Sequence, residues 1–353
     1  MKNPDPKTVL DAHVREILGW HFRPETGTPV WLEFARSAGF DPLKIGSFDE
    51  LVERFPNFDG ERLRTDPHEA WIPRAYQGRP FTIFETGGTT GMPKQRIGWD
   101  DYKRDYESFS ATLPEESFPH GGYWLMVGPT GPRRLRLAIE HLANYRGSSC
   151  YFVDLDPRWV KKLIGAGDAA GAKAYMEHVV EQAVLLLRNR RISVVFTTPK
   201  LLEALGEELS LADAGVRGIL CGGTEMNPQM VRFLVEEVLE NRVAFRPVYG
   251  NTLMGLAACD PDSLARDFSV TYHAPQPWAV LRVTDPADAR KLVPHGQRGR
   301  VELTTLTKEL FLPRFLERDD AIRQPPCALY AWDGAGEVKP FQEAGTRIIE
   351  GVY

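Results

Sequence analysis

The chain has 353 residues, of which 42% are hydrophobic and 26% are charged, close to the average of soluble globular proteins. This composition excludes a chain that is disordered throughout, and a net charge of -5 argues against the basic surface that nucleic acids require. No run approaches the roughly 20 apolar residues of a membrane span, and the N-terminal segment lacks an apolar signal-peptide core. We therefore expect a cytoplasmic protein with neither nucleic acid nor a membrane as its partner.

Hydrophobic patterning divides the chain into three regions. Residues 1–80 combine short amphipathic stretches with many aromatic residues and prolines, and we expect a helical cap there. Over residues 81–265 short apolar runs alternate with helical patterns, which is typical of βαβ units, and we expect an α/β nucleotide-binding core. The expected buried strands are residues 81–84, 123–127, 150–153, 192–196, 219–221 and 244–249.

Helical periodicity is clearest in the second half of this core. Apolar residues recur at helical spacing over residues 176–187 and again over 231–238. Asn227 is placed to cap the second helix and Pro228 to begin it, so residues 221–227 should form a sharp strand-to-helix turn. After residue 265 this periodicity ends, and residues 266–353 are expected to form a smaller β-rich subdomain. The predicted fold class is α/β, with mainly parallel sheets flanked by helices.

The segment of residues 85–94, ETGGTTGMPK, is the densest candidate for a phosphate-binding loop. Its glycines allow the backbone to point several N–H groups at one anion, while threonine hydroxyls and a lysine add further donors. The spacing differs from a P-loop, because Pro93 precedes the lysine and no hydroxyl residue follows it. A P-loop kinase or GTPase is thus disfavoured, and the alternative is a flexible turn with a solvated lysine. The candidate phosphate ligands are Thr86, Gly87, Gly88, Thr89, Thr90, Gly91 and Lys94.

This segment resembles the signature T-[SG]-G-T-T-G-x-P-K of the adenylate-forming superfamily, which includes acyl-CoA synthetases, adenylation domains and luciferase. Within that superfamily the chain looks most like the phenylacetate-CoA ligase branch, and like shortened members that serve antibiotic and phenazine (griseoluteate-type) pathways. The resemblance implies that residues 86–94 close over the β- and γ-phosphates of ATP. It covers roughly residues 75–340.

Three further segments occur in the order that this resemblance requires. The segment 221–225 resembles the family's G-[AG]-E, which lines the adenine and acyl pockets; 249–252 resembles Y-G-x-T; and 312–319 resembles P-x-x-R-Y-x-x-G-D. The resemblance implies that Tyr249 stacks on adenine, Thr252 faces the α-phosphate and Asp319 binds the ribose hydroxyls. The alternatives are close helix–sheet packing at the glycines, a core aromatic at Tyr249 and a solvated acidic pair at Asp319. The nucleotide-binding candidates here are Gly222, Gly223, Thr224, Glu225, Tyr249, Gly250, Asn251, Thr252 and Asp319.

The chain departs from the family pattern at two places. Leu253 stands where Y-G-x-T normally continues with a glutamate that helps to hold Mg²⁺, so the metal ligands are unknown, with Glu85 or Glu225 as substitutes. Mg²⁺ is still expected, because phosphates bind it well and it usually keeps several waters. The mobile C-terminal domain of the family, with its catalytic lysine, is expected to be absent.

The sequence therefore predicts an ATP-dependent ligase that activates a carboxylic acid as an acyl-adenylate. Thr252 and Lys94 are the expected catalytic residues, and ATP and Mg²⁺ the expected cofactors. The acid is expected between the 222–225 turn and the loop 127–132. Arg133 or Arg134, just beyond that loop, could attract a further carboxylate, although a solvated charge pair is the preferred interpretation. An aromatic acid is favoured by the branch resemblance alone, and the acyl acceptor could be CoA, a carrier protein, an amine or a reductase. The alternative function is a nucleotide-binding pseudoenzyme or accessory subunit with little turnover.

Overall fold

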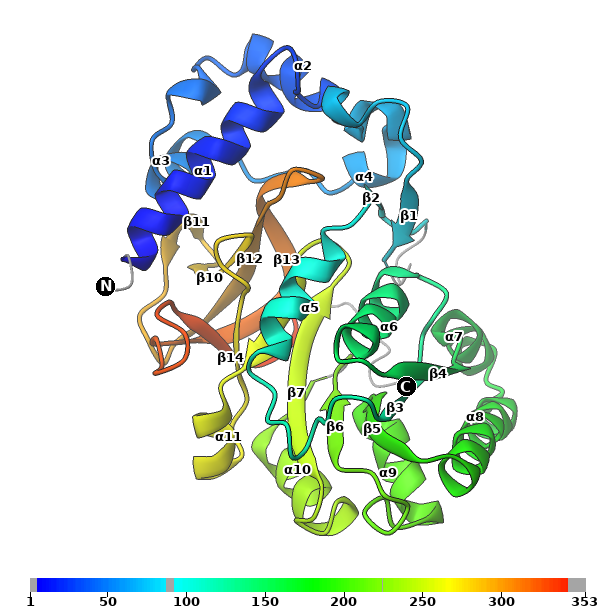
Figure 1. Cartoon of the computed structure of the whole chain (residues 1–353). Coiled ribbons are helices and arrows are strands. Elements are labelled where there is room, and N and C mark those ends of the chain that lie inside the picture. Colours follow the sequence, from blue (N-terminus) through cyan, green and yellow to red (C-terminus); the bar gives the residue numbers. More distant parts are fainter. Residues whose placement is uncertain (1–4, 87–91, 224, 342–353) are drawn as a thin grey trace.

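A twelve-stranded mixed sheet runs through the whole molecule (Figure 1). The computed structural model describes residues 5–86, 92–223 and 225–341. The strand order is β11-β10-β12-β13-β14-β9-β8-β7-β6-β5-β3-β4, and the half from β4 to β7 is parallel. The parallel strands are β3 (Tyr123–Gly128), β4 (Ser149–Asp154), β5 (Ile192–Thr197), β6 (Gly218–Cys221) and β7 (Ala244–Asn251). This parallel half confirms the predicted α/β core.

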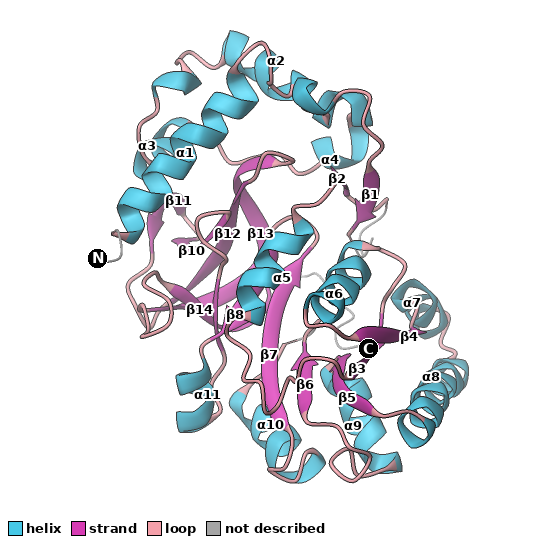
Figure 2. Cartoon of the chain, viewed as in Figure 1, coloured by secondary structure: helices cyan, strands magenta, loops and turns pink. Residues whose placement is uncertain are grey.

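Helices cover both faces of the parallel half, as alternating βαβ connections require (Figure 2). Val194 and Phe196 pack in one cluster with helices α5 and α6, while Val195 packs on the opposite face with α8, α9 and α10. The helices of this half are α5 (Tyr102–Ser110), α6 (Arg134–Tyr145), α7 (Pro157–Gly165), α8 (Ala169–Asn189), α9 (Pro199–Glu208) and α10 (Pro228–Phe233), followed by the π-helix η4 (Leu234–Val238). Asn227 caps α10 by accepting from the Met230 amide at 2.9 Å, which confirms the predicted turn.

The other half of the sheet is antiparallel and is continuous with the first, because β7 pairs with β6 on one side and with β8 on the other. It corresponds to the predicted β-rich part. Its strands are β8 (Gly255–Cys259), β9 (Thr271–His273), β10 (Ala279–Asp285), β11 (Asp288–Leu292), β12 (Arg298–Leu306), β13 (Phe311–Gln324) and β14 (Gly334–Pro340), with helix α11 (Pro261–Asp267) between β8 and β9.

The N-terminal helices form a layer over this antiparallel half (Figure 1, blue). The layer is held by aromatic packing: the rings of Trp31 and Phe55 lie 5.0 and 5.4 Å from the ring of Phe311 on β13, centre to centre. Burial of such rings stabilises the packing of this layer on the sheet. The helices of the layer are α1 (Pro6–Phe22), α2 (Pro29–Ser37), η1 (Pro42–Lys44), α3 (Phe48–Arg54), α4 (Arg62–Thr65), η2 (His68–Trp71) and η3 (Arg74–Tyr76).

The first expected strand is formed, but it is not part of the parallel sheet. Residues 81–84 were predicted as a buried strand of the parallel sheet, whereas β1 (Thr82–Glu85) pairs only with β2 (Gln95–Gly98), as a separate antiparallel hairpin. The segment between these strands reverses the chain, so that the two strands satisfy each other's backbone groups. The glycine–threonine segment is thus the connection between the two strands of a hairpin and does not follow a strand of the parallel sheet.

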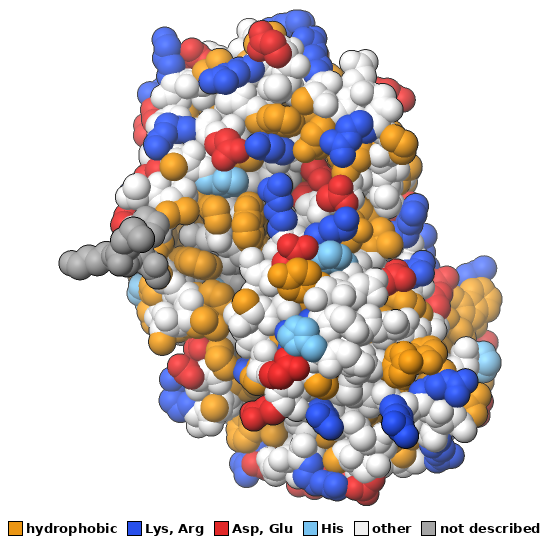
Figure 3. Space-filling view, viewed as in Figure 1, with side chains coloured by type: hydrophobic (Ala, Val, Ile, Leu, Met, Phe, Trp, Pro, Cys, Tyr) orange, Lys and Arg blue, Asp and Glu red, His pale blue; other side chains and the backbone are white. Residues whose placement is uncertain are grey.

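None of the helices within the described residues is long and apolar enough to cross a membrane. The face of the molecule in Figure 3 carries Lys and Arg interspersed with Asp and Glu, without a continuous stripe of either sign.

Candidate functional site

The ends of the glycine–threonine loop are joined at the tip of the β1–β2 hairpin. The Thr86 amide donates to the Lys94 carbonyl at 3.0 Å, and the Lys94 amide donates to the Thr86 hydroxyl, also at 3.0 Å. The predicted loop residues Gly87, Gly88, Thr89, Thr90 and Gly91 lie outside the described residues. The two described ends, Thr86 and Lys94, are held together by these two hydrogen bonds and are called the loop base.

The carboxyl end of β7 lies directly against this base. The Thr252 hydroxyl donates to the Glu85 carbonyl at 2.9 Å, so the residue expected to face the α-phosphate contacts the last residue of β1. Asn251 shapes the turn that follows, because its side-chain oxygen accepts from the amides of Leu253 and Met254 at 2.9 and 2.7 Å. Strand ends of open α/β sheets are the usual place for ligands.

Tyr249 and Asp319 are brought together although 70 residues separate them. The Tyr249 hydroxyl donates to the Asp319 carboxylate at 2.6 Å, linking β7 to β13. Burial raises the pKa of Tyr249 well above its usual range, and the negative charge of Asp319 acts in the same direction. Burial also raises the pKa of Asp319, although the Tyr249 hydrogen bond lowers it. Asp319 is therefore a fixed acceptor rather than one half of a solvated acidic pair.

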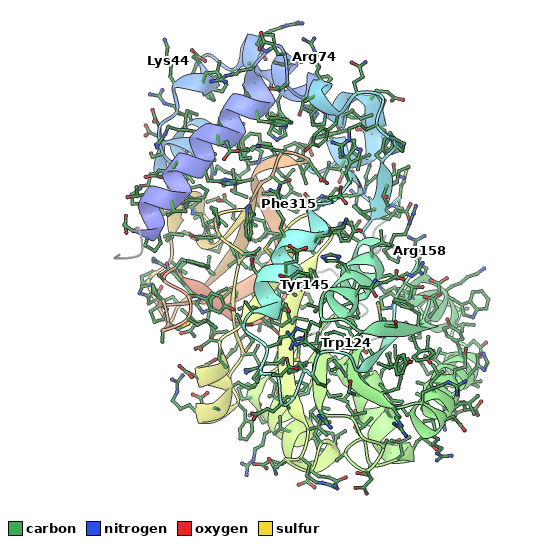
Figure 4. All side chains as sticks on the ribbon, viewed as in Figure 1. Lys44, Arg74, Trp124, Tyr145, Arg158 and Phe315 are labelled. Carbon is green, nitrogen blue, oxygen red and sulfur yellow. The ribbon has the colours of Figure 1, made fainter. Side chains whose placement is uncertain are left out.

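Lys94 turns back from the loop base toward β13. Its ammonium lies 4.4 Å from the ring centre of Phe315, whose position on β13 is labelled in Figure 4. Burial lowers the pKa of Lys94, while the charge of Glu317 raises it. The lysine is half-buried and held beside aromatic and acidic groups, so it is not the freely solvated side chain of the alternative interpretation.

Glu317 is a residue of the candidate site that the sequence analysis did not predict. Its carboxylate accepts from the Asn251 side-chain amide at 2.8 Å, and burial, with help from Asp319, raises its pKa to about 7. The signal was available, because residues two apart on a strand share a face, and Glu317 stands two positions before Asp319. Glu317 therefore lies close enough to both Asp319, on the same strand, and Lys94, from the loop base, for their charges to affect its pKa.

The glycines of the 222–225 turn serve close packing. A side-chain carbon on Gly222 would stand 2.9 Å from the Val248 carbonyl, and one on Gly250 would stand 2.7 Å from the Gly255 carbonyl. Gly223 has φ of +103°, which disfavours any larger residue. Thr224 lies outside the described residues, and Glu225 is half-buried. The turn thus lies against β7, next to the segment that contacts the loop base.

Comparison with solved structures matches the chain to 2-hydroxyisobutyryl-CoA ligase in several states. The ligase in the postadenylation state in complex with R3-HIB-AMP aligns with a TM-score of 0.67 at 15% identity, over 93% of this chain and 66% of the ligase chain. The ligase in the thioesterification state with 2-HIB-AMP and CoA aligns at 0.67 and 14% identity, over 95% and 68%, and an open conformation at 0.68 and 15%, over 96% and 76%. This chain shares the fold of that ligase.

The likeness to 2-hydroxyisobutyryl-CoA ligase concerns the fold, and in the first alignment this chain spans slightly less than two thirds of the ligase chain. No family model and no curated protein sequence matches the chain. In the folded chain, the predicted segments, which are far apart in the sequence, lie in contact around the carboxyl end of β7.

Within the described residues, no group of three or more His, Cys, Asp and Glu side chains is placed to hold a metal ion. Leu253 is buried in the apolar cluster beneath the N-terminal helices. The Glu85 carboxylate is occupied by Arg158, at 2.7 Å, near the start of α7 (Figure 4). Any Mg²⁺ would depend on the phosphates and on waters, so we derive no chemical step through it.

The solvated charge pair expected at Arg133 and Arg134 fits only the first residue, because Arg133 is exposed and Arg134 is buried. Arg134 is 5% exposed, with one guanidinium nitrogen 3.8 Å from Asp101 and the other 3.8 Å from Asp105. Helix α6 begins at this residue and directs it inward, under the sheet end, where opposite charges compensate for burial. In the loop 127–132, the Pro132 carbonyl accepts from the Glu85 amide at 3.2 Å, so this loop also borders the hairpin.

Proposed function

We propose that this protein binds ATP and activates a carboxylic acid as an acyl-adenylate, with release of pyrophosphate. The contact that carries the proposal is the hydrogen bond from the Thr252 hydroxyl to the Glu85 carbonyl. It joins the base of a glycine–threonine loop to the end of β7, which also carries Tyr249, and the Tyr249 hydroxyl in turn donates to Asp319 on β13. The triphosphate of ATP requires hydrogen-bond donors, its ribose requires a carboxylate, and its adenine ring requires an aromatic side chain on which to stack.

The chemistry requires alignment more than acid–base catalysis. A carboxylate oxygen attacks the α-phosphorus of ATP, the bond from that phosphorus to the β-phosphate oxygen breaks, and pyrophosphate leaves with the electron pair. No proton is transferred, because the acid is already ionised near neutral pH. In this proposal Thr86 and Lys94 hold the leaving pyrophosphate, and the Thr252 hydroxyl rotates from the Glu85 carbonyl to donate to an α-phosphoryl oxygen, where it stabilises the developing charge.

The class of acid and the acyl acceptor are inferred from the sequence resemblance and from the structures of similar fold. The acid would lie between the turn at 222–225 and the loop 127–132, and an aromatic acid is favoured by the sequence resemblance. The acyl group could pass to CoA, a carrier protein, an amine or a reductase. CoA receives some support, because the structures of similar fold include a CoA ligase with CoA bound.

Pyrophosphate exchange tests the proposal directly. Labelled pyrophosphate should return to ATP when the protein is given ATP, Mg²⁺ and a panel of aliphatic and aromatic acids, and acyl-AMP should be found by mass. Omitting the acid is the control. Absence of exchange with every acid, together with ATP binding, would leave only the second candidate function.

That second candidate is a nucleotide-binding protein with the same fold and little turnover. The burial of Leu253 at the position of an expected metal ligand favours it, since transfer from ATP normally relies on a cation to neutralise developing charge. Calorimetry with ATP would then show binding while exchange stays at the background rate.

A further inference from the structure

Arg96 connects the phosphate-loop hairpin to the turn that carries Thr252. It lies on β2, two residues after Lys94, and only 1% of it is exposed. One guanidinium nitrogen donates to the Thr252 carbonyl at 2.9 Å and to the Leu253 carbonyl at 2.8 Å. A single side chain therefore binds two successive carbonyls of the turn between β7 and β8.

The Arg96 guanidinium is itself held from the other side. Its second nitrogen donates to the Asp101 carboxylate, which also accepts from the Thr307 hydroxyl at 2.9 Å. Arg134 lies 3.8 Å from the other oxygen of Asp101. Because a buried ion pair with several partners has few alternative arrangements, Arg96 has one defined position.

The hairpin and the turn are thus joined twice, from opposite strands. The end of β1 accepts from the Thr252 hydroxyl through Glu85, and β2 binds the Thr252 and Leu253 carbonyls through Arg96. Either bond alone would allow the turn to rotate about the contact. Together they fix the Thr252 side chain relative to the base of the loop.

We propose that Arg96 is a positioning residue for adenylate formation, which keeps Thr252 at a constant distance from Thr86 and Lys94, the described ends of the phosphate-binding segment. This inference rests on the function proposed above. An error of about 1 Å in such a site can cost roughly 100-fold in rate. Arg96 does not touch the substrate in this proposal, so its loss should lower kcat for pyrophosphate exchange while the KM for ATP changes less than threefold.

The experiment compares Arg96→Met and Arg96→Lys with a matched control, Arg146→Met. Arg146 is also buried, 3% exposed, and donates to the carbonyls of Ser110 and Phe118 at 3.1 and 3.0 Å, but it lies beyond the far end of α6 from the hairpin. Both Met variants remove a buried guanidinium from backbone carbonyls. We expect at least a tenfold loss of kcat per folded molecule in Arg96→Met, partial recovery in Arg96→Lys, and wild-type kcat in Arg146→Met.

Hydrogen exchange provides a readout that is independent of turnover. The amides of residues 252–256 should exchange at least tenfold faster in Arg96→Met than in the wild type, and at the wild-type rate in Arg146→Met. Wild-type protection of these amides in Arg96→Met would overturn the inference, as would wild-type kcat in an active enzyme. If the wild type shows no exchange of pyrophosphate with any acid, the proposed function fails, and faster amide exchange still supports the role of Arg96 in fixing the turn.

Discussion

Replacing Asp319 by alanine tests the nucleotide side of the candidate site. The carboxylate is held by the Tyr249 hydroxyl at 2.6 Å, so it is oriented before a ligand arrives. A hydrogen bond to a charged group contributes about 1.5–3 kcal/mol, and a ribose offers two hydroxyls, one of which competes with Tyr249. We therefore expect Asp319→Ala to weaken ATP binding by on the order of 2–4 kcal/mol, or roughly 30- to 900-fold in Kd.

Calorimetry with ATP and with 2′,3′-dideoxy-ATP separates a ribose contact from general damage. The wild type should prefer ATP, and Asp319→Ala should bind both nucleotides with similar affinity. Asp320→Ala is the matched control, because Asp320 is the next residue on β13 and pairs with Arg298 at 2.5 Å. An Asp319→Ala protein that still prefers ATP over the dideoxy nucleotide would refute the assignment of Asp319 to the ribose.

Three further changes test other parts of the site. Lys94→Met should slow pyrophosphate exchange about 10- to 100-fold, because the positive charge that stabilises the leaving pyrophosphate is lost. An unchanged rate would exclude Lys94 from that role. Glu317→Gln should be more stable than the wild type by on the order of 1–2 kcal/mol at pH 8. The gain should vanish below about pH 4: the folded protein keeps the Glu317 proton up to a pKa of about 7, the unfolded chain releases it near 4.3, and stability falls as pH rises between the two. Urea unfolding at several pH values measures this slope, and parallel curves for the two proteins would contradict it. Gly222→Ala should destabilise the fold by about 1–3 kcal/mol in the same assay, because the new methyl group would meet the Val248 carbonyl at 2.9 Å; an unchanged midpoint would show that β7 yields there.

Local signals predicted the elements around the site well. The apolar runs at 123–127, 192–196 and 219–221 correspond to β3, β5 and β6, and the Asn227 cap begins α10 as expected. Such features depend on residues close in the sequence, where periodicity and capping chemistry decide the outcome. The exception is the strand at 81–84, since an apolar run does not say whether its partner is a sheet or a returning hairpin strand.

Periodicity and capping could not predict contacts between segments that are distant in the sequence. The pairing of Tyr249 with Asp319, the Arg96 bonds to the Thr252 turn and the burial of Arg134 each join residues on different elements. Which charged side chain is buried depends on the direction in which a helix or strand presents it and on the opposite charges it meets there. By itself, the sequence determined the α/β strand and helix pattern and the glycine–threonine loop. Only the tertiary structure decided which charges lie at the base of that loop, because folding alone brings Arg96 of β2 and Asp319 of β13 against the carboxyl end of β7.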